Sequence, residues 1–161
     1  MECIKSSIFL IFLLSWPCFV HAENRDQQRK LFWQARQLLM TQHYRQFAAL
    51  QVHLKDYPLY PYLIFIKLKQ QLPTEDRAEI NDFLQTYSDT PLAPKLRADW
   101  LAYLAKKQDW LHFIHYYQPI YGTTLQCHYL HSLLATQQKA LAFRKISLLW
   151  LNVNSAPSVC R

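Results

Sequence analysis

The sequence is poor in glycine, with Gly122 as the single glycine among 161 residues. β-Hairpins and phosphate-cradling loops draw heavily on glycine, because their backbones enter conformations that other residues avoid. Strand-like alternation of apolar and polar residues is also absent, and one glycine cannot supply a Gly-x-Ser-x-Gly nucleophile motif. These absences argue against a β-fold, a nucleotide-binding loop and a serine hydrolase, and they favour helices throughout.

The first 22 residues have the pattern of a secretory signal peptide. A compact apolar run covers residues 8–14, and Val20-His21-Ala22 fits a small-x-small cleavage site. The run is shorter than the ~20 residues of a membrane-spanning helix and Pro17 interrupts it, so an uncleaved anchor is the less favoured alternative. We therefore expect export from the cytoplasm, with residues 1–22 as the signal peptide and residues 23–161 as one mature domain.

Cysteine is scarce in the mature chain, where only Cys127 and Cys160 remain after cleavage. Thiols oxidise outside the cytoplasm, so we expect these two to form a disulfide, with two buried free thiols as the alternative. The positions are 33 residues apart (160 minus 127). Closing a loop of that size would stabilise the fold by roughly 3 to 4 kcal/mol.

Carboxylate side chains are missing from the last third of the chain, since none follows Asp109. The formal net charge is +7, and the basic residues beyond that point are Lys139, Arg144, Lys145 and Arg161. Such a surface favours acidic partners, which outside the cytoplasm are peptidoglycan or anionic lipid and not nucleic acid. A basic surface without a dedicated partner is the alternative.

Apolar residues recur at spacings of three and four, as at Leu31, Ala35, Leu38 and Leu39. Prolines and turn residues divide this pattern into about eight antiparallel helices. Asp109 is an expected helix N-cap, and so is Thr74. The predicted ranges are 25–41, 43–55, 60–71, 75–87, 92–106, 109–117, 124–137 and 139–151.

Taken in pairs, these helices repeat every 32 to 35 residues or so, which is the period of helix-hairpin repeat proteins. The tryptophan, glycine and tyrosine pattern of the tetratricopeptide consensus is not present. The sequence therefore predicts an all-α fold, an irregular α-solenoid built as a helix-hairpin superhelix. Its last hairpin should present an uncapped apolar face, so we expect self-association or a partner at the C-terminal end.

Two prolines three residues apart form an elbow between the second and third predicted helices. Pro58 ends one helix and Pro61 suits the first turn of the next, while Tyr57, Tyr60 and Tyr62 are expected to fill the corner. The elbow resembles one that joins two early helices in the N-terminal superhelical domain of the soluble lytic murein transglycosylases. These are periplasmic enzymes that cleave the glycan strand of peptidoglycan.

Weaker motifs extend this resemblance over essentially the whole mature chain, in the same order and spacing. They are Asp109-Trp110, Gly122-Thr123-Thr124, Gln126-Cys127-His128-Tyr129, Leu148-Leu149-Trp150, and Ser155-Ala156-Pro157 with Cys160. The resemblance implies a cysteine pair at Cys127 and Cys160 and a periplasmic location. It also implies peptidoglycan or cell-wall proteins as partners.

The catalytic residue of the resembled family is a glutamate in a Glu-Ser context, within a C-terminal domain. No glutamate of this chain precedes a serine; the four are Glu2, Glu23, Glu75 and Glu79. The resemblance therefore implies a truncated N-terminal scaffold without a catalytic residue or cofactor, and it leaves open whether the chain is an enzyme. A stand-alone periplasmic helical-repeat adaptor that binds another protein is the alternative.

A group of acidic residues offers glycosidase-like chemistry, because such enzymes use two carboxylates that flank the scissile bond. The group lies on one predicted helix and consists of Glu75, Asp76, Glu79 and Asp82. A solvated face with acids in the first helical turn explains it better.

Histidines and tryptophans offer two further kinds of site. His112 and His115, then His128 and His131, are spaced to share helix faces near Cys127, so a zinc site can be drawn. Packing between helices is the favoured explanation, and no metal is expected. The same explanation is favoured over sugar stacking for the four tryptophans of the mature chain, Trp33, Trp100, Trp110 and Trp150.

Overall fold

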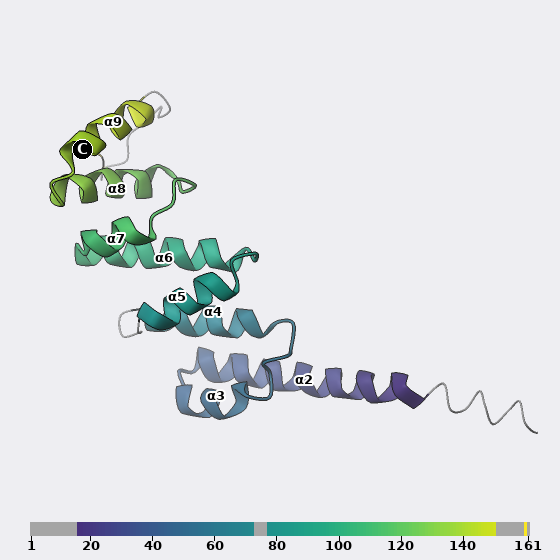
Figure 1. Cartoon of the computed structure of the whole chain (residues 1–161). Helices are drawn as coiled ribbons and strands as arrows, with labels where there is room; N and C mark the ends of the chain where they lie inside the picture. Colours follow the sequence, from purple (N-terminus) through teal and green to yellow (C-terminus); the bar gives the residue numbers. More distant parts are fainter. Residues whose placement is uncertain (1–15, 73–76, 151–159, 161) are drawn as a thin grey trace, which may run out of the picture. The chain divides into compact units, whose positions relative to one another are not determined.

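The structure is a computed structural model that describes residues 16–72, 77–150 and 160. Within these residues the chain is helical and contains no strand, so the predicted all-α fold is confirmed (Figure 1). Eight helices are described: α2 (Trp16–Met40), α3 (Tyr44–Gln51), α4 (Tyr60–Gln71), α5 (Arg77–Thr86), α6 (Leu92–Lys107), α7 (Trp110–Tyr116), α8 (Thr123–Ala135) and α9 (Lys139–Trp150).

Most predicted helix boundaries agree with the structure to within two residues. The first helix is the main exception, because α2 already begins at Trp16 and not at residue 25. The second predicted helix, 43–55, was too long. α3 ends at Gln51, and hydrogen-bonded turns follow it in place of a further helical turn. The predicted cap Thr74 lies outside the described residues.

The chain divides into two compact units, Met1–Ile64 and Phe65–Arg161. In the first unit, α2 packs against α3. The shared core is apolar and almost fully buried, which is the main source of stability for such a hairpin. Its members are Phe32, Ala35, Leu39, Phe47, Leu54 and Leu63.

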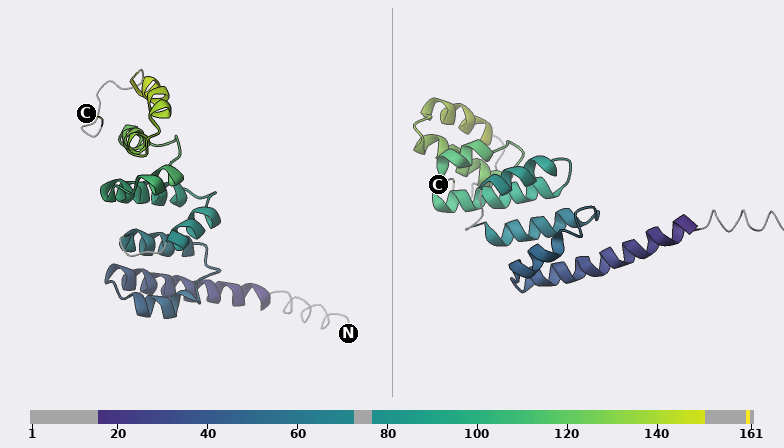
Figure 2. Two further views of the ribbon diagram at one scale, coloured as in Figure 1. Left: turned by 60° about the vertical axis from the view of Figure 1, so that its left-hand side comes forward. Right: turned by 60° about the horizontal axis from the view of Figure 1, so that its bottom comes forward.

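In the second unit, successive helices from α5 to α9 pack against one another, and α6 also contacts α8. Both views of Figure 2 show these green and yellow-green helices next to one another. α6 supplies the largest share of the core, with seven buried residues. Phe83 from α5 and Phe113 from α7 are also almost fully buried. Each helix thus packs mainly on its neighbours in sequence, as in an irregular α-solenoid.

Three glutamines form the turns inside three hairpins. Gln42, Gln108 and Gln137 follow α2, α6 and α8, and they are the positive-φ residues of the described chain, with φ of 61°, 57° and 63°. In each turn, the residue after the glutamine donates its N–H to a carbonyl five residues earlier. The distances are 2.8 Å from His43 to Leu38, 3.0 Å from Asp109 to Leu104 and 2.7 Å from Gln138 to Leu133. This is the Schellman motif, which usually has glycine at the left-handed position.

The links between hairpins are built differently. They are longer, and each contains a proline: Pro58 after α3, Pro91 after α5 and Pro119 after α7. Proline cannot continue a helix, whereas glutamine can. Within the described residues, the chain therefore uses two kinds of connection.

Candidate functional sites

The elbow between α3 and α4 consists of consecutive hydrogen-bonded turns. The N–H of Tyr57 bonds to the carbonyl of Leu54 at 2.9 Å, and the N–H of Tyr60 bonds to the carbonyl of Tyr57 at 2.8 Å. The Tyr57 ring packs against Phe32 of α2, with ring centroids 5.5 Å apart. Tyr62 is 45% exposed, so its ring does not fill the corner as expected. The elbow therefore orients α4 and offers no reactive group.

Cys127 of α8 and Cys160 form a disulfide, with their Cα atoms 5.2 Å apart. Cys127 is buried against the core, at 3% exposure. The bridge spans 33 residues and fastens the end of the chain to the first half of α8. Its role in the structure is therefore to hold the last hairpin closed.

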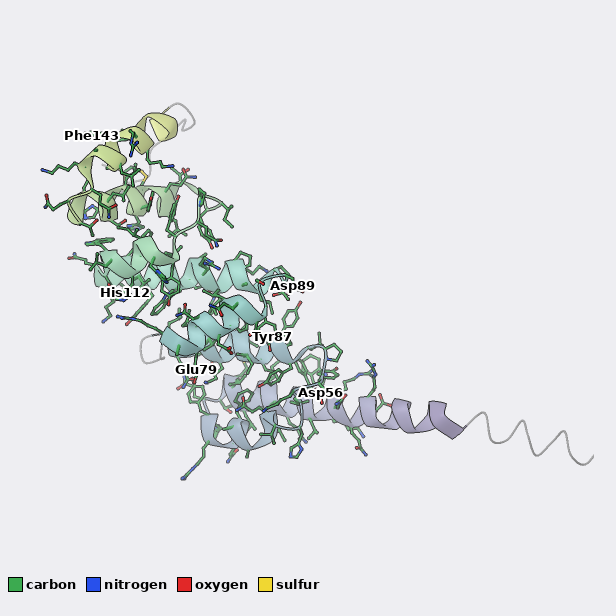
Figure 3. All side chains as sticks on the ribbon, viewed as in Figure 1. Asp56, Glu79, Tyr87, Asp89, His112 and Phe143 are labelled. Carbon is green, nitrogen blue, oxygen red and sulfur yellow. A yellow bond between two sulfur atoms is a disulfide. The ribbon has the colours of Figure 1, made fainter. Side chains whose placement is uncertain are left out.

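The acidic group on α5 lacks the arrangement of a glycosidase pair. Glu79 forms an ion pair with Lys67 of α4 at 2.6 Å (Figure 3). Asp82 is exposed to solvent, and its charge adds to burial in raising the pKa of Tyr87. Glu75 and Asp76 lie outside the described residues. The described carboxylates therefore serve helix packing and solvation.

Asp109, His112 and Arg77 form a closed polar network that links α5 to α7. Asp109 accepts hydrogen bonds from Nδ1 of His112 at 2.7 Å and from Arg77 at 3.2 Å. A second Arg77 nitrogen lies 2.8 Å from Nε2 of His112. When Nε2 carries no proton it accepts a hydrogen bond from Arg77, while Nδ1 donates to Asp109. Figure 3 shows His112 on α7.

This network corrects the expected role of Asp109. The residue is at the N-cap position of α7, but its carboxylate makes no capping bond to the helix. Burial raises its pKa, while the hydrogen bond from His112 and the charges of His112 and Arg77 lower it by more, so the pKa of Asp109 lies below its ordinary value of 3.8. The carboxylate is consequently charged at neutral pH and joins two helices.

The other three histidines of the predicted zinc group, His115, His128 and His131, pack on aromatic rings. His128 lies 6.2 Å from Phe113 and His131 lies 4.7 Å from Trp110, measured between ring centroids. Burial and the neighbouring His131 lower the pKa of His128. Within the described residues, no group of three or more histidine, cysteine or carboxylate side chains could hold a metal ion.

The tryptophans occupy different environments, so the prediction that all would pack between helices is partly wrong. Trp100 is buried at 3% exposure, and Trp110 is half-buried beside His131. Trp33 is 57% exposed on α2. The Phe32 ring meets it edge-on, with centroids 5.6 Å apart, and the guanidinium of Arg36 lies 5.6 Å from its centroid. The side chain of Trp150 lies outside the described residues.

A groove of about 510 Å³ lies between α2 and α3. Its apolar side chains are Leu38, Ala49 and Leu50, and its polar side chains are Gln34, Gln37, Gln46 and His53. No carboxylate, lysine or arginine lines it. Because Gln37 follows Trp33 by four residues, the indole and this amide are neighbours on one face of α2.

Sequence reasoning did not find the groove or the Arg77 network. The spacing of three between Asp109 and His112 was a usable signal for their contact, since such residues share a helix face. Arg77 is 32 residues from Asp109, so only the fold brings them together. The groove likewise depends on how α2 and α3 cross.

The fold and these sites define an all-α protein built from stacked helical hairpins. No model of a protein family matches the chain. Soluble lytic murein transglycosylases of Salmonella typhimurium and Escherichia coli K12 are each 28% identical to it over 151 residues. These matches cover 93% of this chain and 23% of each relative.

Solved structures agree with the sequence matches. The 70-kDa soluble lytic transglycosylase in complex with bulgecin A superposes with a TM-score of 0.75 at 27% identity, over 84% of this chain and 22% of that one. Lytic transglycosylase Slt of Pseudomonas aeruginosa superposes with a TM-score of 0.70 at 34% identity, over 81% of this chain and 21% of that one. The resemblance predicted from the elbow and the later motifs is confirmed, and the chain spans less than a quarter of the relatives' length.

Proposed function

We propose that this chain acts in murein processing as a helical scaffold that binds the cell-wall glycan and supplies no catalytic residue. The similarity to lytic murein transglycosylases, in sequence over 93% of this chain and in fold over 84%, is the observation that carries the proposal. The matched segment corresponds to 23% of the relatives, which agrees with an N-terminal scaffold. The ion pair of Glu79 with Lys67 supports a structural role for the best-placed carboxylate.

The proposed location is the periplasm, reached through a signal peptide at residues 1–22 that leaves a domain of residues 23–161. Cleavage after Ala22 would remove the first seven residues of α2, Trp16 to Ala22, and leave its packed part intact. Within the described residues, no helix is long and apolar enough to cross a membrane. Intact-mass measurement of the exported chain should show Glu23 as its first residue, and a retained Met1 in the cytoplasm would contradict this.

The function is tested by incubating the purified exported chain with isolated murein sacculi. We expect it to sediment with the sacculi and to release no anhydro-muropeptides above a heat-inactivated control. Glu79→Gln should leave this result unchanged. Turnover that Glu79→Gln abolishes would contradict the non-catalytic role, and failure to sediment would contradict binding.

A second candidate is a helical-repeat adaptor for another protein, and the exposed face of α9 favours it. Phe143 projects from α9 with 67% of its surface exposed, and Ile146 is 37% exposed (Figure 3). Residues three apart lie on one helix face, so the two form an apolar patch. This patch is also where we propose self-association of the chain.

A further inference from the structure

We propose that the outer face of α2 docks reversibly on an anionic phospholipid surface. In this contact, Trp33 and Met40 enter the headgroup layer and the basic side chains beside them pair with lipid phosphates. The contact goes beyond the proposed murein role and does not depend on it. It concerns the first unit alone, where the opposite face of α2 packs against α3. Its basis is the order of apolar and basic side chains along one exposed helix face.

The helical repeat defines the outer face of α2. Phe32, Ala35 and Leu39 are buried and mark the packed face. At about 100° per residue, Trp33 and Met40 lie on the other side of the helix, and they are in line because seven residues make nearly two turns. Their side chains are 57% and 55% exposed and are separated by about 10 Å along the helix axis. Two large apolar side chains are thus aligned in solvent.

Basic side chains flank this apolar pair. Arg29 and Arg36 lie on one side of it, again seven residues apart, and Lys30 lies on the other; all three are exposed. The guanidinium of Arg36 is 5.6 Å from the centroid of the Trp33 ring. Asp26 also lies on this face and is paired with Arg29 at 3.4 Å. The face is therefore apolar along its middle and positively charged at its sides.

The charge of the first unit has the same sign. Residues 23–64 contain six lysine or arginine side chains and three carboxylates. An anionic phospholipid surface attracts such basic segments, and tryptophan is enriched at membrane–water interfaces because its ring is amphipathic. Arginine and lysine can lay their aliphatic stems along an apolar contact while their charged ends stay with the phosphates. A surface with phosphates above apolar chains therefore complements both parts of this face.

The shape of the face favours a lipid surface over a folded protein. Trp33 and Met40 project from a convex helix, and neither side chain lines the groove between α2 and α3. A protein partner would need a pocket for each of them, whereas a fluid headgroup layer adapts to a convex ridge. Because packing occupies the opposite face of α2, only the outer face can enter the interface, so the contact is peripheral and reversible.

The test is flotation of the exported chain, beginning at Glu23, with lipid vesicles. We expect the chain to float with vesicles of phosphatidylglycerol and phosphatidylethanolamine and not with neutral phosphatidylcholine vesicles. Trp33→Ala should weaken binding by about tenfold. The Arg29→Gln/Arg36→Gln double variant should weaken it by about 25-fold, since each basic residue near an anionic surface contributes about fivefold.

Matched controls come from α3 and its end, in the same unit. The Arg45→Gln/Lys55→Gln double variant removes two exposed charges, as the α2 double variant does. Val52→Ala shortens an apolar side chain that is 54% exposed at the C-cap of α3. These controls should change vesicle binding by less than about twofold, and thermal unfolding should show that every variant folds.

Fluorescence reports whether the indole enters the lipid. Vesicles with brominated acyl chains quench a tryptophan that reaches the boundary between headgroups and chains. We expect them to quench the exported wild type, and Trp33→Phe should lose this quenching although Trp100, Trp110 and Trp150 remain. Quenching that persists in Trp33→Phe would contradict the assignment to this side chain.

The remaining outcomes separate this inference from its rivals and from the proposed function. Equal binding by Trp33→Ala and Val52→Ala, or equal losses in the two double variants, would show adhesion by net charge and overturn the assignment. Binding to polyglutamate as tight as to vesicles, and equally dependent on Trp33, would identify an acidic polypeptide and overturn the lipid. A chain that ignores vesicles but sediments with sacculi would overturn the inference and leave the murein role standing.

Discussion

The first hairpin, α2–α3, and the last, α8–α9, share a turn but differ in the surface that they expose. Gln42 and Gln137 close the two turns in the same left-handed conformation. The first hairpin carries an open groove with a mainly apolar surface, and Trp33 is exposed on α2. The last carries exposed Phe143 and no carboxylate, and a disulfide fastens it.

The difference shows that hairpins with the same turn conformation can expose different side chains to solvent. Turn geometry depends on a few backbone hydrogen bonds, whereas an exposed face has no packing requirement of its own. The two hairpins therefore present different surfaces although they share one turn conformation. The following predictions test this contrast, beginning with the largest expected effect.

Cys160→Ser should lower stability the most. The lost bridge closes a 33-residue loop, and its removal should cost roughly 3 to 4 kcal/mol in the chain-entropy model. We expect a melting temperature lower by several degrees, measured by circular dichroism. The Cys127→Ser/Cys160→Ser double variant should match the single variant. An unchanged melting temperature would contradict the structural role of the bridge.

Phe143→Ser should weaken self-association, which we place on the apolar face of α9. Two such faces would bring like charges together, because each α9 carries Lys139, Arg144 and Lys145. Salt shortens the Debye length from about 10 Å at 0.1 M to about 3 Å at 1 M, so association should strengthen as salt rises.

Sedimentation velocity at the two salt concentrations measures this association. The variant should associate about tenfold more weakly, a change of about 1.4 kcal/mol. Val52→Ser removes a side chain that is 54% exposed in the first unit and should have no effect. Equal association in Phe143→Ser would exclude this face.

Asp109→Asn should weaken the second unit by about 0.5 to 1 kcal/mol at neutral pH, since it removes a partly exposed ion pair and its hydrogen bond. The pKa of Asp109 is lowered in the folded chain. Its contribution is therefore complete above its ordinary pKa of 3.8 and disappears as pH falls through the lowered value.

Melting temperatures at pH 7 and near pH 3 test this dependence. The difference between wild type and Asp109→Asn should shrink at the lower pH. Asp26→Asn is the matched control in the first unit, because Asp26 forms only an exposed pair with Arg29 at 3.4 Å. A difference that grows on acidification would contradict the assigned sign.

Replacing each turn glutamine with glycine should give the smallest change, and a stabilising one. Gln42→Gly and Gln137→Gly relieve a left-handed conformation that costs a side-chain-bearing residue about 1 kcal/mol. Denaturant unfolding should show similar gains of about 0.5 to 1 kcal/mol in the two hairpins. Gln85→Gly, within α5, should instead destabilise by about 1 kcal/mol. Stabilisation by one of these glycine substitutions and destabilisation by the other would contradict the claim that the two turns share one conformation.

Much of the fold was predictable because it depends on local patterns. The spacing of apolar residues and the prolines located the helices, and α4 has the predicted range of 60–71. The turn glutamines were not predictable, since nothing in the sequence marks Gln42 or Gln108 as left-handed. The continuation of α2 back to Trp16 was also missed, because the signal-peptide pattern was taken to end before the first helix.

The candidate sites were less predictable because they depend on exposure and on contacts between distant residues. Trp33 and Trp100 have similar apolar neighbours in sequence, yet one is exposed and the other is buried. Their exposure depends on which face of α2 and of α6 packs against neighbouring helices. The network of Arg77 with Asp109 likewise requires α5 and α7 to be placed first.

The most direct test of the murein-binding role is sedimentation of the exported chain with sacculi across a salt series. A chain of net charge +7 will adhere to an anionic polymer at low salt whatever its function. At about 1 M salt, charges on the protein surface are screened beyond roughly 3 Å. The account predicts that wild type still sediments with sacculi under that condition. Release of the wild-type chain into the supernatant at high salt would show that charge alone held it there, and would contradict recognition of the glycan.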